Sequence, residues 1–244
     1  MMKKTIIITG ATRGIGKGLF DRLSSESFNL ATMYHSDDKS ADLLRNTCVD
    51  KNIDFIIEKI NVKDFNQVQL FVDNVIIKYG RIDYLINNVG TSIFKTIYDT
   101  TLDEWEESQD ILLNAPFILC KSVLPIMRQQ QFGRIVNIGA STKDYMKGVA
   151  RIGLFAIHKA ALTVLTKTLA LEEIKHGITV NMVAPGSTKD AGIIPEENRT
   201  SVSQIPIGRR IEVDEIVEAI MYFLSDKAGS TTGQFIGVNG GSST

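Results

Sequence analysis

The sequence predicts an α/β fold: one doubly wound domain in which helices cover both faces of a seven-stranded parallel sheet. Along the whole chain, short apolar runs alternate with longer segments of 3.6-residue apolar periodicity. Most of the short runs are continuous and rich in β-branched residues, as expected where both faces of a strand are buried. No segment rich in Pro, Gly or Ser divides the chain, so residues 1–244 are expected to form a single domain.

The first two elements are a strand and a helix joined by a glycine-rich turn. Lys4–Thr9 is a run of β-branched residues, and Ile15–Ser25 has the apolar spacing of an amphipathic helix. The same two patterns then alternate to the end of the chain. They predict strands at Leu30–Tyr34, Ile53–Ile60, Tyr84–Asn87, Arg134–Gly139, Ile178–Val183 and Gln234–Val238, and helices at Lys39–Val49, Asp64–Tyr79, Leu102–Met127, Gly153–His176 and Val213–Leu224. Gly186–Pro206 breaks the pattern, and an irregular stretch of this length predicts a substrate lid.

The composition argues against several classes of function. With 27 basic and 28 acidic residues, the chain lacks the basic excess of nucleic-acid-binding proteins. Its two cysteines, Cys48 and Cys120, are far apart, which argues against a disulfide scaffold and a zinc site and suits a reducing cytoplasm. No uninterrupted apolar run reaches the roughly 18 residues of a membrane span, and Met1–Thr9 is too short for a signal peptide. We therefore expect a cytoplasmic protein that binds no metal, no nucleic acid and no membrane.

The turn after the first strand has the chemistry of a phosphate site. In Thr9–Gly16 (TGATRGIG), Gly10 permits a tight turn, Gly14 lets the backbone approach a phosphate, and Gly16 lets the helix pack closely on the strand. The helix that follows offers free N–H groups to an anion. A turn of this kind after the first strand predicts a Rossmann-type dinucleotide site. The expected contacts include the other turn residues Thr12, Arg13 and Ile15.

Seven segments occur in one order along nearly the whole chain: TGATRGIG at 9–16, NNVG at 87–90, GRIVNIG at 133–139, HKAAL at 158–162, GITVNMVAPG at 177–186, IPIGR at 205–209 and TGQFIGVNGG at 232–241. Together they resemble the short-chain dehydrogenase/reductase family, and within it the bacterial 3-oxoacyl-acyl-carrier-protein reductases. The resemblance implies NAD(P)(H) bound at the carboxyl ends of the strands. It also implies a homodimer or homotetramer built on the two long helices.

Residues near the second strand favour NADP(H) over NAD(H). NAD-binding proteins place an acidic residue after this strand to hold the ribose 2′-hydroxyl, whereas NADP-binding proteins place a cation there for the 2′-phosphate. Here Tyr34 is followed by His35, and the first carboxylate is Asp37, which we expect to serve the next helix instead. Arg13 occupies a position where many NADP-dependent relatives carry a basic residue. By resemblance, the further cofactor contacts are His35, Asn61, Asn88, Gly90, Lys159, Pro185, Gly186 and Thr188.

The resemblance implies a catalytic tetrad of Tyr, Lys, Ser and Asn, and this chain departs from it. Lys159 matches the family lysine, but Phe155 stands four residues earlier where the family has the proton-donating Tyr. Ala140 follows GRIVNIG where the family has Ser, and Leu112 occupies the position of Asn. Asn114 is two residues further on, about 200° around an α-helix, so it cannot simply substitute. Three of the four groups are therefore replaced by apolar side chains.

Nearby polar residues are candidate substitutes. Ser141 and Thr142 adjoin Ala140, and Tyr145 lies in the following loop, although no lysine stands four residues after it. We rank these below their ordinary roles, which are turn hydroxyls and a loop aromatic. His158 is expected to be a packing or helix-surface residue, because neighbouring residues on a helix face different ways.

Three functions stay open from the sequence. The first is an NADPH-dependent reductase of a small or acyl-carrier-bound carbonyl, impaired by the three replacements. The second is a non-catalytic relative that binds the cofactor or partners an active subunit. The third, non-redox chemistry by Lys159 or Tyr145 in an apolar pocket, has no positive support.

Overall fold

The seven predicted strands form one parallel sheet in the computed structural model, which describes residues 3–26, 28–140, 148–189, 194–195 and 198–242. The strand order is β3-β2-β1-β4-β5-β6-β7, and every neighbouring pair is parallel. The strands are β1 Lys4–Thr9, β2 Phe28–Tyr34, β3 Phe55–Lys59, β4 Tyr84–Asn87, β5 Gly133–Ile138, β6 Ile178–Pro185 and β7 Phe235–Val238. The predicted fold class is confirmed.

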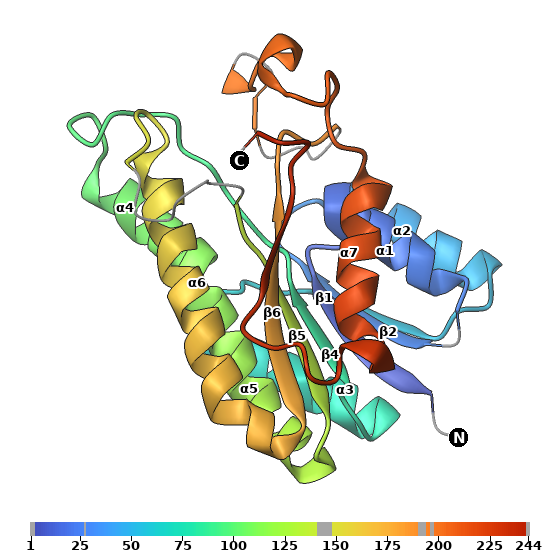
Figure 1. The fold of residues 1–244 in the computed structure, drawn as a ribbon. Helices are drawn as coiled ribbons and strands as arrows, with labels where there is room; N and C mark the ends of the chain where they lie inside the picture. The colour runs from blue at the N-terminus through green and yellow to red at the C-terminus, as the bar shows by residue number, and fades with distance from the viewer. Residues whose placement is uncertain (1–2, 27, 141–147, 190–193, 196–197, 243–244) are drawn as a thin grey trace.

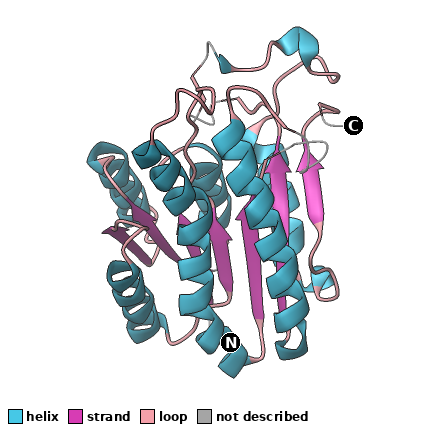
Figure 2. Ribbon diagram, turned by 90° about the vertical axis from the view of Figure 1, so that its left-hand side faces the viewer, coloured by secondary structure: helices cyan, strands magenta, loops and turns pink. Residues whose placement is uncertain are grey.

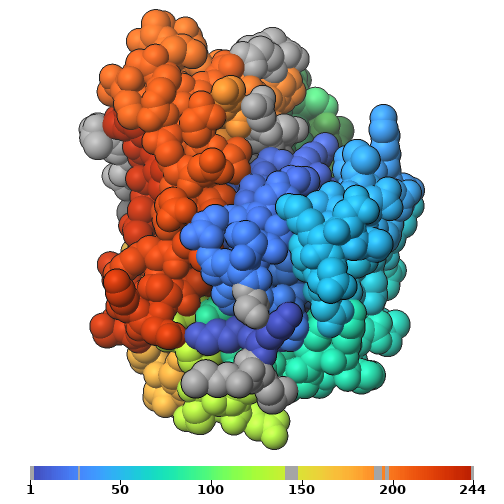
Figure 3. Space-filling view, turned by 90° about the vertical axis from the view of Figure 1, so that its right-hand side faces the viewer, coloured from blue at the N-terminus to red at the C-terminus, as the bar shows by residue number. Residues whose placement is uncertain are grey.

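Helices alternate with these strands and cover both faces of the sheet (Figure 1). They are α1 Gly14–Ser24, α2 Asp38–Asp50, α3 Phe65–Tyr79, α4 Leu102–Gln109, α5 Ala115–Gln130, α6 Gly153–Glu173 and α7 Val213–Leu224. One core joins α1, α2 and α7 to the sheet, and the other joins α3, α5 and α6 to the opposite face. Figure 2 looks onto the second layer, and Figure 3 shows α7 beside α1 on the first.

The predicted helix Leu102–Met127 is interrupted, which the apolar pattern did not indicate. A π-helical turn, η1, occupies Asp110–Asn114 between α4 and α5. A π-turn accommodates one extra residue within a helix and is frequent at functional sites. Leu112, at its centre, is fully buried. The interruption therefore falls on one of the positions that the family resemblance assigns to catalysis.

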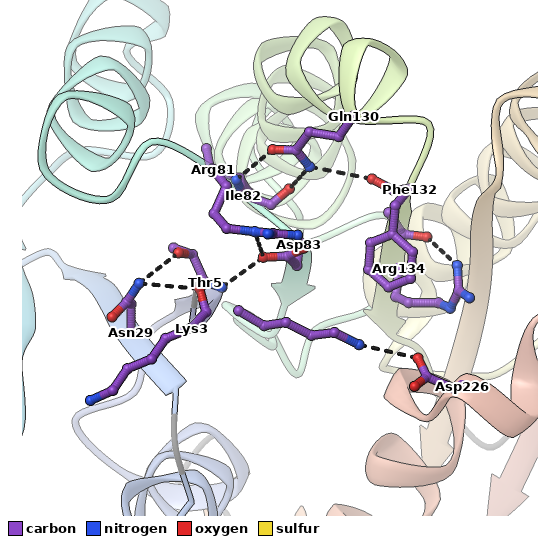
Figure 4. A network of polar contacts seen from close by, with 12 residues as sticks. Lys3, Thr5, Asn29, Arg81, Ile82, Asp83, Gln130, Phe132, Arg134 and Asp226 are labelled. Atoms are coloured by element: carbon purple, nitrogen blue, oxygen red, sulfur yellow. Dashed lines mark hydrogen bonds and ion pairs between the residues drawn. The ribbon is translucent and has the colours of Figure 1, made fainter. Parts of the chain in front are cut away.

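Polar side chains close the amino edge of the sheet (Figure 4). Arg81 donates to both oxygens of the buried Asp83, at 2.8 and 2.5 Å, and Asp83 accepts the backbone N–H of Thr5 at 2.8 Å. The Gln130 amide accepts from the N–H of Ile82 and donates to its carbonyl. Since the strands all point away from this network, the opposite, carboxyl edge is the one left for a ligand.

Two helical segments, Leu102–Gln130 and Gly153–His176, are long and apolar enough to span a membrane by length and composition alone. In each, 44% of the most apolar window is buried within the protein, because both segments pack on the sheet. Such burial is typical of core helices in soluble α/β proteins.

The predicted lid, Gly186–Pro206, is irregular where the structure describes it. Its described part contains the short 3₁₀ helix Val202–Gln204. Residues 190–193 and 196–197 lie outside the described part.

Candidate active site

The candidate site lies at the carboxyl edge, where the strand order changes direction. β1 pairs with β2 on one side and with β4 on the other, so the chain continues from β1 and from β4 toward opposite ends of the sheet. Ligands of open α/β sheets bind in the crevice at such a switch point. The turn after β1 and the segment after β4 meet here.

The glycine-rich turn depends on glycine at each of the three predicted positions. Gly10 and Gly14 have φ of +68° and +57°, a region that favours glycine. A Cβ on Gly16 would lie 2.4 Å from the Gly10 carbonyl oxygen and 2.6 Å from Nδ2 of Asn88. Any side chain at Gly16 would therefore displace the turn.

Asn88 holds the turn from the neighbouring strand. Its Nδ2 donates to the carbonyls of Thr9 and Gly10, at 2.9 and 3.2 Å. In return, the Thr9 hydroxyl accepts the backbone N–H groups of Asn88 and Val89, at 2.9 and 3.0 Å. Asn88 is thus a positioning residue for the glycine-rich turn Thr9–Gly16, which we call the cradle.

The cradle has the donors that a pyrophosphate needs. Arg13 is the N-cap of α1, and its side chain forms no capping hydrogen bond with the helix. The first N–H groups of α1 are consequently left for an anion, and the helix dipole favours negative charge there. The half-buried Thr12 and Ile15 flank them. These residues fit a dinucleotide pyrophosphate.

Asp37, which follows β2, has the role at the start of the next helix that the sequence predicts. Asp37 N-caps α2 by accepting the N–H of Ser40 at 3.0 Å. This bond, assisted by the charge of Arg13, lowers the pKa of Asp37. Because its carboxylate serves the helix, Asp37 is poorly placed to take ribose hydroxyls. His35 and Arg13 are both exposed.

The remaining predicted cofactor contacts lie at the ends of β3, β4 and β6. Asn61 uses its side-chain oxygen within its own turn, accepting the N–H of Lys63 at 3.1 Å. Gly90 has room for a side chain, since a Cβ there would come no closer than 3.8 Å to Leu112. Asn61 therefore stabilises its own turn, and Gly90 leaves free space beside Leu112.

The turn after β6 is closely packed. It begins at Pro185, the last residue of the strand, and a Cβ on Gly186 would lie 2.8 Å from the Asn239 Cα. The Thr188 hydroxyl donates to the Gly186 carbonyl at 2.9 Å, and the residue is 6% exposed. Thr188 therefore points into the turn rather than into open space.

Lys159 is a buried ammonium at the end of β5. Its Nζ donates to the Ile138 carbonyl at 2.5 Å, and the residue is 4% exposed. Burial lowers the pKa of Lys159 to about 8. Phe155 lies one helical turn earlier, with its ring centroid 5.8 Å from Nζ, and Ala140 lies two residues beyond Ile138. The structure thus brings Phe155, Ala140 and Lys159 to one place.

Leu112 lies in the π-turn, which packs against α6, and its side chain comes near Gly90. Asn114 does not take its place, because its Nδ2 donates to the Asp110 side chain at 2.8 Å, on the same helix. The candidate substitutes Ser141, Thr142 and Tyr145 lie outside the described residues.

A buried hydrogen-bonded pair, His158 and Ser108, was not predicted from the sequence. His158 Nδ1 lies 2.9 Å from the Ser108 hydroxyl, and its ring packs edge-on against Trp105 at 4.9 Å. The ring is 2% exposed, and burial lowers the pKa of His158. The expected packing role of His158 is confirmed, and the pair joins α4 to α6 beside Lys159. Spacing offers no signal for it, since the partners are 50 residues apart.

The described residues contain no group of three or more His, Cys, Asp or Glu side chains that could hold a metal ion.

Comparisons with known proteins find matches along nearly the whole chain. The family model described as Enoyl-(Acyl carrier protein) reductase matches residues 10–243. YtkK of Bacillus subtilis, provisionally named an oxidoreductase, is 33% identical over 243 residues, covering 96% of this chain and 94% of that protein. The 3-oxoacyl-[acyl-carrier-protein] reductase FabG of Staphylococcus aureus is 31% identical over 245 residues, covering 98% of both chains.

Solved structures give the same result. A provisionally described 3-oxoacyl-reductase from Bacillus thuringiensis is 33% identical, with a TM-score of 0.86 and 98% of each chain covered. A variant of actinorhodin polyketide ketoreductase, solved with NADPH, is 25% identical, with a TM-score of 0.89 and complete coverage of both chains.

Proposed function

The chain belongs to the short-chain dehydrogenase/reductase family, and from that premise we propose that it binds NADP(H) and is an impaired 3-oxoacyl reductase. Its substrate class is a small or acyl-carrier-bound carbonyl compound. The observation that carries the proposal is the contrast within one site. The cradle of Gly10, Gly14 and Gly16 is intact, while Phe155 lies beside Lys159 and Ala140 is buried at the end of β5, both apolar.

The preference for NADP(H) rests on charge at the end of β2. Asp37 is engaged as the cap of α2, whereas the exposed guanidinium of Arg13 is near enough to lower the pKa of Asp37. A cation beside a carboxylate that already caps a helix suits a 2′-phosphate. The NADPH carried by the related ketoreductase supports the same preference.

The impairment follows from the chemistry of the step. Bound NADPH would supply a hydride, and the carbonyl oxygen would then need a proton or a hydrogen-bond donor. Neither Phe155, Ala140 nor Leu112 has a side-chain donor, and the Lys159 ammonium is directed at the Ile138 carbonyl. Losing a positioned general acid costs roughly 10²–10⁴-fold, and losing one oxyanion donor about 10²–10³-fold. Slow turnover is therefore expected even with the cofactor bound.

A second candidate function is a cofactor-binding partner in an assembly with an active subunit or with a second copy of the chain. The observation that favours an assembly is an exposed apolar stripe on α6, formed by Ile157, Val164 and Leu171 at seven-residue spacing. A groove of about 340 Å³ runs beside it between α5 and α6. A contiguous apolar surface is typically covered by a partner. We propose a dimer or tetramer in the cytoplasm.

The test separates binding from chemistry. NADPH and NADH are titrated into the protein by calorimetry, and turnover is then measured with a generic 3-oxoacyl thioester. We expect NADPH to bind and turnover to be slow. Gly16→Ala should abolish binding because its Cβ has no room, whereas Gly148→Ala, where a Cβ meets nothing within 4 Å, should not. Failure of the wild type to bind NADPH would refute the proposal.

A further inference from the structure

The ammonium of Lys159 is uncompensated in the part of the chain that the structure describes. Its only hydrogen bond there is to the neutral carbonyl of Ile138, and its aromatic neighbour is Phe155. No described carboxylate forms an ion pair with it, and burial alone accounts for its shifted pKa. A phenol at position 155 would be able to share or neutralise this charge, but a phenyl ring cannot.

The switch-point geometry places the two halves of a dinucleotide. The pyrophosphate belongs at the turn around Gly14, and the adenosine half belongs toward β2, where Arg13 and Asp37 lie. The nicotinamide half must then extend the other way, past β4 toward β5 and α6. That direction leads to the region of Gly90, Ala140 and Lys159.

We infer that the site of Lys159, Phe155 and Ala140 selects the reduced cofactor over the oxidised one, so that the chain distinguishes NADPH from NADP⁺ by binding. The two forms differ by one positive charge on the nicotinamide ring. A buried lysine that no described carboxylate pairs with repels the charged ring, and the apolar side chains of Phe155 and Ala140 solvate it poorly. The inference rests on the proposed cofactor binding and deepens it. It gives a function to a site in which Phe155, Ala140 and Leu112 have no side-chain proton donor.

The size of the effect follows from the separation of the two charges. We take the 5.8 Å between Nζ and the Phe155 centroid as the scale of that separation. Two like charges about 6 Å apart, at an effective dielectric constant of about 20–40, reduce binding by roughly 10- to 100-fold. We expect the dissociation constant for NADP⁺ to exceed that for NADPH by at least about tenfold.

The experiment measures both dissociation constants by calorimetry for four proteins. These are the wild type, Lys159→Met, Phe155→Tyr, and Lys167→Met, which removes an exposed lysine from the same helix. Lys159→Met should bring the two constants to within about threefold of each other, because the repelling charge is gone. Phe155→Tyr should narrow the ratio as the phenol ionises. Lys167→Met should leave the wild-type ratio unchanged.

The outcomes distinguish the two proposals. Equal binding of NADPH and NADP⁺ by the wild type would overturn the inference and leave the cofactor site intact. A wild-type preference that persists in Lys159→Met, with Lys167→Met as control, would also overturn it. Binding of neither form would refute the proposed function itself. Phe155→Tyr tests the same charge if Lys159→Met does not fold.

Discussion

Restoring a phenol beside Lys159 should convert the chain into a competent reductase. In Phe155→Tyr with Ala140→Ser, the new hydroxyl groups would stand at the end of β5, next to an ammonium that is already in place. At the 5.8 Å between Nζ and the present ring, an effective dielectric constant of about 20 gives an attraction of about 3 kcal/mol between phenolate and ammonium. That attraction lowers the pKa of the phenol below its ordinary value, and burial opposes the shift.

A general acid with a pKa near working pH contributes at least about 10²-fold. We therefore expect turnover of a 3-oxoacyl thioester to rise at least about 10²-fold in the double variant, with NADPH affinity little changed. The added serine should help further, but the two gains belong to one catalytic unit and are not multiplied. The assay is NADPH oxidation under saturating cofactor, with Lys159→Met in the double-variant background as the control that should lose the gain.

Leu112→Asn should be added only after Phe155→Tyr and Ala140→Ser have been tested together. Position 112 is fully buried, so an unsatisfied amide there would cost about 1–3 kcal/mol of stability. Two results would refute the reasoning. One is an NADPH-binding double variant that is no faster than wild type. The other is a wild type that is already fast and that Tyr145→Phe inactivates, because the loop tyrosine would then be the acid.

Three further predictions concern the cofactor, the assembly and pH. Arg13→Ala should weaken NADPH binding at least about tenfold and NADH binding little, because only NADPH carries the 2′-phosphate; equal losses in calorimetry would contradict this. Val164→Glu, at a position 66% exposed on the apolar stripe, should convert the oligomer to a monomer by light scattering, unless the wild type is already monomeric. Burial lowers the pKa of His158 in the folded protein below the value of about 6.5 of an unfolded chain. As pH falls, the unfolded chain therefore binds a proton at this histidine before the folded protein does. The free energy of unfolding should fall as pH drops below about 6.5 and should not change above it. His158→Gln should remove this dependence in urea titrations from pH 5 to 8, and His35→Gln, at an exposed position, should not.

Local chemistry explains what could be predicted. The strands and helices have the periodicities that their burial requires. Apart from the interruption at Asp110–Asn114, their predicted bounds lie within three residues of those observed. The glycine turn and the N-cap role of Asp37 were also predictable, because a positive φ and a free helix N-terminus each demand a particular residue type. In both cases the cause lies within a few residues along the chain.

What could not be predicted depends on contacts distant in sequence or on small changes in helix geometry. His158 meets Ser108 only because α6 packs on α4, and nothing in the local sequence of either marks the pair. Thr188 has the residue type expected of a cofactor contact, yet its hydroxyl bonds back to Gly186. The π-turn was missed because one extra residue barely alters an apolar pattern across so long a helix.

That extra residue has a consequence for how the chain tolerates insertions and deletions. Removing one residue from Asp110–Asn114 would convert the segment to a continuous α-helix and rotate α4 by about 100° relative to α5. Ser108 would then turn away from His158, even though no residue of either helix face had been substituted. The rotational orientation of α4 relative to α6 therefore depends on the number of residues in the π-turn as much as on the side chains in contact.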